Sequence, residues 1–329
     1  DEGGGFTRWT LSTMESEILD TAHEHAYVSY DSPINSDEMV ITCPYQNYNC
    51  PLSLHESNGD FIQNIAEGNV SALQFSNDGQ LLLTSNNNDG STEIWAYDTT
   101  TWEGLYNITS PIGTDNIDSI EFSPDDTIVA LGGYNIVRLF NTTSWEMIEE
   151  LPTSHHAFSF SPDGHYFSYL NVSMGSATNE LVIRNMNDGS EVIKTLDRYA
   201  MGGVSFSPDS TQIAITIAAN LDGDARTGYC HTCTPPEGYD YGGIQVFRLD
   251  TWQLVLEYSC GFKERSGGDI CIASGVHFSP VGDVLAVLMS NSAYPAQDSG
   301  IMLFGADSDN DLVADFMDRC LNTQLSAAV

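Results

Sequence analysis

One five-residue phrase recurs along the chain and restricts its fold more than any other feature. An alternating apolar segment ends in Phe-Ser-Pro-Asp-Gly or a close variant, and a second apolar segment follows. The copies begin at Tyr30, Phe75, Phe122, Phe160, Phe206 and Phe278. The first five lie about 40 residues apart, which is the period of a repeated four-stranded unit, and an insertion lengthens the last step. The repeat therefore predicts an all-β fold built from similar units.

The chemistry of the phrase predicts a turn between two strands. Proline presets φ at the first turn position, aspartate bonds its own backbone, and glycine accepts a positive φ. The segments on either side, such as residues 128–131, are apolar nearly throughout, as strands covered on both faces are. A third strand, a polar turn and a fourth strand follow, and three of these turns share Asp or Asn, then Thr, then Trp.

These residues resemble the WD40 repeat family over about residues 6–305. The Phe-Ser-Pro-Asp-Gly turn is matched, and the apolar strand ending in Trp-Asp is matched more loosely. The Gly-His pair that opens a typical WD40 repeat is absent, so the family's Asp-His-Ser/Thr-Trp network is not carried over. The resemblance implies a β-propeller of four-stranded blades, with six blades favoured and seven as the alternative. Residues 6–20 are a candidate for the missing outer strand that closes the ring.

The charge of the chain limits its partners. It has 46 Asp and Glu against 10 Lys and Arg, a formal net charge of -36. Such a field repels nucleic acid and anionic lipid. No apolar run is long enough to span a membrane. We therefore expect neither nucleic-acid binding nor membrane insertion of this chain, and the expected partners are other proteins or copies of the chain itself.

Cysteines and sequons indicate an exported chain. Close cysteine pairs in loop-like segments predict disulfides in an oxidising compartment. The predicted pairs are Cys43 with Cys50, Cys230 with Cys233, and Cys260 with Cys271. Zinc remains an alternative for Cys230 and Cys233, which flank His231. Sequons predict glycosylation at Asn69, Asn107, Asn141 and Asn171. We expect an extracellular or cell-surface location, with a signal peptide removed or the chain trimmed ahead of Asp1.

The end of the chain has the spacing of a calcium loop. Calcium takes about six to eight oxygens, which alternate positions of a twelve-residue loop can supply. Carboxylates this close together repel one another unless a cation lies among them. The predicted ligands are Asp307, Asp309, Asp311, the Val313 carbonyl, Asp315 and Asp318. Calcium is therefore the expected cofactor, and a solvated acidic tail is the alternative.

Residues 307–323 resemble a thrombospondin type 3 repeat, through this aspartate spacing and through Cys320 and Thr323 after it. Leu312 replaces the turn glycine of that family, and Leu321 replaces its proline. The resemblance implies a calcium-binding tail over residues 306–329, after a propeller domain over residues 1–305. It also implies tandem repeats whose cysteines pair with one another, so Cys320 is expected to find its partner beyond Val329.

No pattern typical of an enzyme active site is found, neither a Gly-x-Ser-x-Gly elbow nor a phosphate-binding glycine loop. We therefore predict a secreted or cell-surface binding or structural module, whose propeller loops contact other proteins and whose tail is a spacer or assembly contact. The loops expected to do so are insertions at about residues 219–242 and 259–273. Two alternatives stay open: an extracellular propeller hydrolase or lyase with an active site at the funnel mouth, and a subunit of a surface layer or filament.

Overall fold

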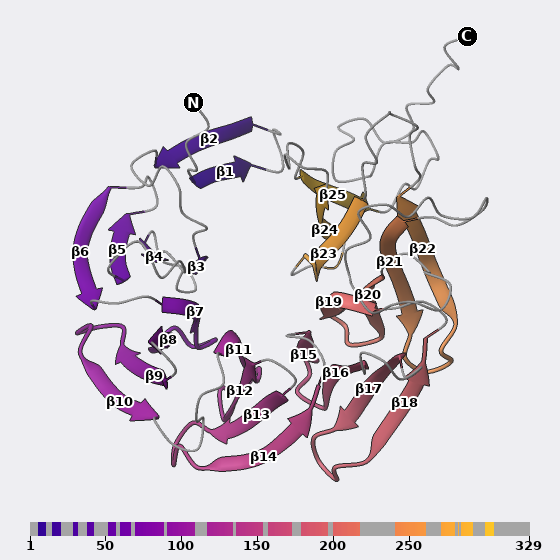
Figure 1. Cartoon of the computed structure of the whole chain (residues 1–329), viewed down its shortest axis with the longest axis horizontal. Helices are drawn as coiled ribbons and strands as arrows, with labels where there is room; N and C mark the ends of the chain where they lie inside the picture. Colours follow the sequence, from indigo (N-terminus) through magenta and orange to yellow (C-terminus); the bar gives the residue numbers. More distant parts are fainter. Residues whose placement is uncertain are drawn as a thin grey trace. The chain divides into compact units, whose positions relative to one another are not determined.

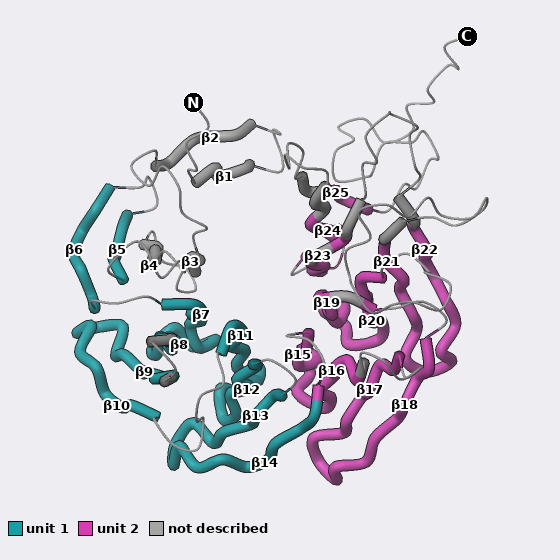
Figure 2. The backbone as a smooth tube through the Cα atoms, in the orientation of Figure 1, with its two compact units in different colours: residues 1–152 teal, residues 153–329 magenta. Residues whose placement is uncertain are grey.

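The structure is a computed structural model, and its described part consists of strands and the turns between them. It describes residues 6–10, 15–20, 29–31, 38–42, 52–56, 60–66, 70–88, 91–108, 117–133, 136–153, 157–172, 179–196, 200–217, 241–260, 271–279, 282, 284–291 and 300–305. The strands fall into two compact units, residues 1–152 and 153–329 (Figure 2).

Unit 1 contains a hairpin and three four-stranded sheets (Figure 1). The hairpin pairs β1 (Phe6–Thr10) with β2 (Glu15–Asp20). Sheet 1 contains β3 (Ser29–Asp31), β4 (Glu38–Thr42), β5 (Leu52–Glu56) and β6 (Phe61–Ala66). Sheet 2 contains β7 (Val70–Phe75), β8 (Leu81–Asn88), β9 (Ser91–Asp98) and β10 (Gly104–Ile108). Sheet 3 contains β11 (Ile117–Phe122), β12 (Ile128–Gly133), β13 (Ile136–Asn141) and β14 (Met147–Pro152).

Unit 2 contains two four-stranded sheets and a third sheet with three described strands. Sheet 4 contains β15 (Phe158–Phe160), β16 (Tyr166–Val172), β17 (Asn179–Asn185) and β18 (Glu191–Thr195). Sheet 5 contains β19 (Ala200–Phe206), β20 (Gln212–Ile217), β21 (Tyr241–Arg248) and β22 (Leu254–Cys260). Sheet 6 contains β23 (Cys271–Phe278), β24 (Val284–Asn291) and β25 (Gly300–Gly305).

Every sheet is an antiparallel meander in which each strand pairs with the next one along the chain. The predicted repeat of four-stranded antiparallel units is therefore confirmed, because each recurring phrase begins at or near the end of the first strand of a sheet. Residues 6–20 do form two strands, which pair with each other. The number of blades, and the part of this hairpin in closing a ring, stay predictions.

The predicted Ser-Pro-Asp-Gly turn forms in the same way in successive sheets. In sheet 4 the Ser161 hydroxyl donates to Asp163 Oδ1 (2.6 Å) and accepts from the Tyr166 amide (2.8 Å). Ser76, Ser123 and Ser207 repeat both bonds in sheets 2, 3 and 5. The serine thus holds both ends of the turn, which sets the register of the first two strands.

The hydrophobic core lies between successive sheets of one unit. In unit 2, Leu170 and Ile183 of sheet 4 pack in one cluster with Phe206 and Ile215 of sheet 5. In unit 1, Leu83 of sheet 2 shares a cluster with residues of sheet 3. Burying such a side chain contributes roughly 1.5–3 kcal/mol. A sheet therefore depends on its neighbour for stability, as expected for a repeat too small to cover its own faces.

Candidate interaction surface

Most of the predicted site residues lie outside the described part of the chain. These are the calcium ligands Asp307, Asp309, Asp311, Val313, Asp315 and Asp318, the cysteines Cys43, Cys50, Cys230 and Cys233, and the sequon residue Asn69. Most of both predicted insertions also lies there. Cys260 is the last residue of β22 and Cys271 the first of β23. Calcium binding, the disulfides and zinc therefore stay predictions.

Three of the sequon asparagines lie on described strands, and each has a defined local environment. Asn107 is on β10, and its side-chain oxygen is buried. The Asn141 side-chain oxygen accepts from the amides of Thr143 (3.0 Å) and Ser144 (2.8 Å), so it closes the turn after β13. Asn171 Nδ2 donates to Glu180 Oε2 at 3.2 Å. Glycosylation of all three stays a prediction.

The described residues offer no metal centre. No three His, Cys, Asp or Glu side chains among them are grouped so as to hold an ion. Over the same residues, no helix has the length and apolar character that a membrane span requires. The described residues that could act on other molecules are therefore those on the repeated turns and strands.

In unit 1 an aspartate joins the turns of two sheets. Asp126 occupies the turn position where the recurring phrase has glycine, and its φ is 57°. Its carboxylate accepts from the Asn77 amide (2.7 Å), Asn77 Nδ2 (2.8 Å) and the Asp78 amide (2.9 Å), all in the turn of sheet 2. An L-residue at positive φ is strained. Asp126 thus adopts a strained backbone conformation and makes three hydrogen bonds to the preceding sheet. We name this set of hydrogen bonds the turn clasp.

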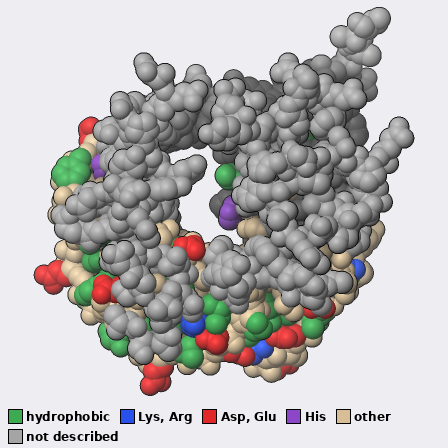
Figure 3. Space-filling model, in the orientation of Figure 1, with side chains coloured by type: hydrophobic (Ala, Val, Ile, Leu, Met, Phe, Trp, Pro, Cys, Tyr) green, Lys and Arg blue, Asp and Glu red, His purple; other side chains and the backbone are tan. Residues whose placement is uncertain are grey.

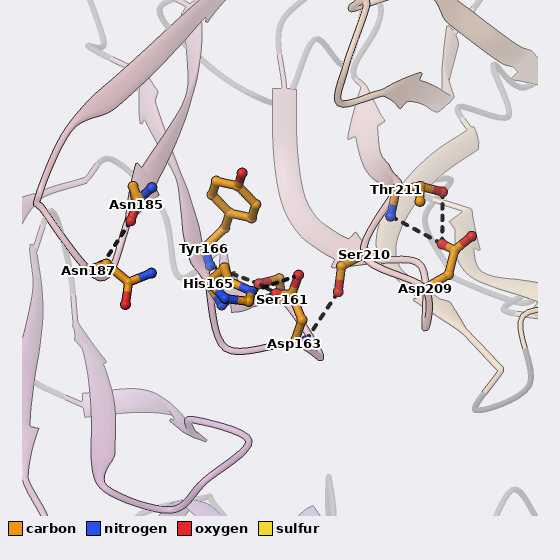
Figure 4. A network of polar contacts seen from close by, with 9 residues as sticks. All are labelled: Ser161, Asp163, His165, Tyr166, Asn185, Asn187, Asp209, Ser210 and Thr211. Carbon is orange, nitrogen blue, oxygen red and sulfur yellow. Dashed lines mark hydrogen bonds and ion pairs between the residues drawn. The ribbon is translucent and has the colours of Figure 1, made fainter.

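Unit 2 contains a smaller version of the same contact. Ser210 also replaces the turn glycine, with a φ of 55°. Its hydroxyl accepts from the Asp163 amide in the turn of sheet 4 at 3.1 Å (Figure 4). Where the turn has glycine, as at Gly164 with a φ of 72°, the same backbone forms without strain. A non-glycine residue at the last position of the turn, Asp126 or Ser210, is therefore the one whose side chain hydrogen-bonds to the turn of the preceding sheet.

The aspartates inside these turns are held in the ionised form. The Ser207 hydroxyl and then the Thr211 side chain lower the pKa of Asp209, because they donate hydrogen bonds to its carboxylate (2.6 and 2.8 Å). In the β9–β10 turn of sheet 2, which hydrogen-bonds to the β7–β8 turn through Thr99, the amides of Thr101 and Thr100 lower the pKa of Asp98 in the same way. Both kinds of turn therefore carry an ionised aspartate at neutral pH.

Three of the turns before fourth strands hold tryptophan in the left-handed conformation, and the turn before β18 has Gly189 there. Trp102, Trp145 and Trp252 have φ values of 59°, 56° and 56°. The Trp145 ring stacks on Tyr106 of β10, with the ring centroids 5.6 Å apart. Lys194 Nζ of β18 lies 6.0 Å from the centroid of Trp252. Trp145 and Trp252 therefore fasten their own sheets to the fourth strand of the sheet before.

The fourth strands expose a repeated pair of hydrophobic residues near their beginnings. We call β6, β10, β14, β18 and β22 the outer strands, because each is the last strand of a four-stranded sheet. The pairs are Phe61 with Ile62, Leu105 with Tyr106, Met147 with Ile148, Val192 with Ile193, and Leu254 with Val255, each residue 39–60% exposed. Hydrophobic side chains and carboxylates lie next to each other on the surface of the described residues (Figure 3).

Scattered exposed hydrophobic residues are ordinary on a soluble protein. Here they are not scattered, since every outer strand has two adjacent apolar residues within its first three positions. A carboxylate precedes four of the five pairs by one or two residues, at Asp60, Glu103, Glu146 and Glu191. In each unit the outer strands therefore present apolar pairs in an acidic setting, and these pairs are the unit's candidate interaction surface.

Comparison with known proteins identifies the fold. The family described as "WD domain, G-beta repeat" matches residues 59–96, a range that includes β6, β7, β8 and most of β9. The hydrazine synthase of Kuenenia stuttgartiensis has a similar structure, with a TM-score of 0.58 and 14% identity over 78% of this chain and 73% of that chain. The chain has a β-propeller fold and contains a WD40-like repeat. Hsv2 of Kluyvelomyces marxianus is similar to this propeller with a TM-score of 0.57 and 13% identity, over 87% of this chain and 78% of that one. A search of curated proteins finds no match.

At identities of 13–14%, the two structural likenesses establish the propeller fold and bring no activity to this chain. The predicted fold class and the resemblance to WD40 repeats are confirmed. The turn clasp and the outer-strand pairs were not predicted, although each leaves a signal in the sequence. One signal is the non-glycine residue at the last position of the turn phrase, and the other is two consecutive apolar residues after the second turn.

Proposed function

We propose that this WD40-like propeller is a non-enzymatic protein-interaction module that works outside the cell or at its surface. The exposed apolar pair, repeated on all five outer strands, is the observation that carries the proposal. Pairs of this kind bury apolar area when a partner docks, at roughly 25 cal/mol per Å². The likeness to WD40 repeats supports the same function, since proteins with these repeats generally mediate protein-protein contacts.

The framework behind the pairs suits such a role. The turn clasp and the left-handed tryptophans hold successive sheets together within each unit. A rigid scaffold loses little conformational entropy when it binds, so more of the contact energy appears as affinity. The acidic composition, with 46 Asp and Glu against 10 Lys and Arg, favours basic partners and steers their approach.

Peptide selection tests this function. Random peptides displayed on phage are selected on the propeller, and the affinity of the enriched peptides is measured by fluorescence anisotropy. A five-site variant replaces one exposed residue on each outer strand by serine: Ile62, Leu105, Ile148, Val192 and Val255. We expect its Kd for the selected peptides to rise at least about tenfold, since truncating interface anchors costs more than about 1 kcal/mol.

Thr100→Ser with Thr143→Ser is the matched control, because both residues are exposed in turns before outer strands. The control is expected to bind as the natural sequence does. The proposal fails if no peptide is enriched above background, or if the five-site variant binds the selected peptides with unchanged affinity. Circular dichroism and the urea midpoint of the variant show whether its fold is retained.

We further propose that the terminal aspartates bind calcium, as their spacing and the likeness to thrombospondin type 3 repeats suggest. Titration calorimetry at about 0.15 M salt, which screens diffuse attraction to the acidic chain, is expected to show one site with a Kd of about 10⁻⁴–10⁻³ M. The double variant Asp309→Asn with Asp311→Asn should raise the Kd for calcium more than about tenfold, whereas Glu103→Gln should leave it unchanged. Equal binding by the double variant would show that the ion lies elsewhere. An affinity in this range suits the calcium level outside cells and so supports the proposed location.

A further inference from the structure

β18 differs from the other outer strands in the regularity of its pairing. Its partner in sheet 4 is β17, and all five of its residues pair in unbroken register from Glu191 to Thr195. The pairing of β6, β10, β14 and β22 with their neighbours is interrupted by at least one register shift. Bulges twist an edge strand and protect it from pairing with another chain. β18 is the outer strand of a four-stranded sheet that lacks this protection.

The hydrogen bonds at the two ends of the β17–β18 pair show which backbone groups face away from the sheet. Asn185 N–H donates to Ser190 O (2.8 Å), and Leu196 N–H donates to Asn179 O (2.9 Å). Hydrogen-bonded and non-hydrogen-bonded pairs alternate along an antiparallel ladder. Val192 and Lys194 therefore direct their backbone groups toward β17. The N–H and C=O groups of Glu191, Ile193 and Thr195 point to the open edge.

The side chains of β18 combine an exposed apolar pair with charged residues that contact neighbouring side chains. Val192 and Ile193 are 52% and 54% exposed and project from opposite faces of the sheet. Glu191 is held by Arg184 Nη1 (3.0 Å) and by the Tyr169 hydroxyl (3.2 Å). Lys194 lies over the rings of Phe247 and Trp252. The two charged residues are thus fixed by neighbours, and the exposed apolar pair is left available on an ordered strand.

The net charge of the chain indicates what kind of segment can pair with β18. A second copy carries the same net charge of -36, so pairing two copies along β18 works against strong repulsion. An acidic segment of another protein meets the same obstacle. A positively charged segment is attracted instead, and one in extended form also supplies the backbone donors and acceptors that the edge requires.

We propose that β18 is the docking edge of this propeller, and that an extended, positively charged segment of another protein pairs with it as a fifth strand of sheet 4. The proposal rests on the proposed function as an interaction module and names the surface and the chemistry of the partner. Main-chain hydrogen bonds to Glu191, Ile193 and Thr195 provide the pairing. Apolar residues of the segment cover Val192 and Ile193, and its basic residues meet the acidic surroundings.

The probe for this inference is a synthetic peptide of about nine residues with alternating Lys and Val, the length of an ordinary strand. Its binding to the full chain is measured by fluorescence anisotropy, and hydrogen exchange of the backbone amides is followed by NMR with and without the peptide. Protection is expected at Glu191, Ile193 and Thr195, whose amides otherwise face solvent. An alternating Glu and Val peptide should bind at least about tenfold more weakly.

Ile193→Pro removes an outward N–H while the bonds between β17 and β18 remain, because proline is tolerated on the open side of an edge strand. We expect the Kd of the Lys–Val peptide to rise at least about tenfold in this variant. Thr100→Ser with Thr143→Ser, both in turns outside the outer strands, is the control and should bind the Lys–Val peptide normally. Exchange of the natural sequence gives an independent reading if the proline variant does not fold.

Three results overturn the inference: unchanged exchange at the three amides, equal binding of the acidic peptide, or full binding by Ile193→Pro. Protection of the same amides at rising protein concentration without any peptide would assign the edge to a second copy instead. If phage-selected peptides bind, and bind less well to the five-site variant but not to Ile193→Pro, the interaction function stands and only the β18 edge is excluded.

Discussion

Gly203→Ala is expected to destabilise unit 2 by about 2–3 kcal/mol, a large effect for one methyl group. A Cβ at Gly203 would lie 2.9 Å from Thr216 Cγ2, 3.0 Å from the Val276 backbone nitrogen and 3.1 Å from the Gly275 Cα. Two of these atoms are backbone atoms of β23, so the clash is relieved only if sheets 5 and 6 move apart. Urea unfolding followed by circular dichroism measures the loss.

Gly275→Ala is the matched control, since Gly275 lies on the facing strand. Its added Cβ would meet only Leu288, at 3.6 Å, which is an ordinary contact distance. We expect the control to unfold within about 0.5 kcal/mol of the natural sequence, as substitutions without a clash usually do. If both variants unfold at the same urea concentration, the close approach of β19 and β23 is not a constraint on stability.

Removing the turn clasp is the second large expected effect. Asp126→Ala loses three hydrogen bonds to the turn of sheet 2 and keeps an L-residue at a φ of 57°. Because the group is partly exposed, we expect a loss of about 2 kcal/mol in the free energy of unfolding. Asp126→Gly loses the same bonds but is relieved of the backbone strain, so its loss should be smaller by about 1 kcal/mol.

Ser210→Gly provides the comparison in unit 2. It removes one neutral hydrogen bond of 3.1 Å and relieves a similar φ of 55°. The two effects nearly cancel, so its urea midpoint should stay close to that of the natural sequence. If Asp126→Gly is as stable as the natural protein, the carboxylate does not fasten sheet 3 to sheet 2.

The repeat was predictable because its information is local. The side chains of Ser161 and Asp163 bond to one another and to the amides of the next few residues, so the phrase identifies the turn wherever it recurs. The strand order follows, because short connections make an antiparallel meander. The apolar runs beside the turns were identified as strands covered on both faces, and residues such as Ile213 and Ala214 are indeed fully buried.

The contacts between sheets and the strand edge proposed for docking could not be predicted in the same way, because they depend on residues far apart in the sequence. Asp126 bonds to Asn77, 49 residues earlier, and although Asp126 stands out as a non-glycine turn residue, its partner cannot be read from either local segment. The sequence around Gly203 does not show that the backbone of β23 lies too close to it to leave room for a Cβ. The open edge of β18 depends on the register of its partner strand. Periodicity alone does not fix such a register.

The contacts between sheets have a direction that matters while the chain is being made. Asp126 reaches back to Asn77, Ser210 to Asp163, and Trp145 to Tyr106, each from a later sheet to an earlier one. During synthesis on the ribosome, each sheet therefore lacks these contacts until about one further repeat has been made and the next sheet has formed. We therefore expect the sheets to be stabilised in order from the N-terminus during synthesis, each one after its successor has emerged.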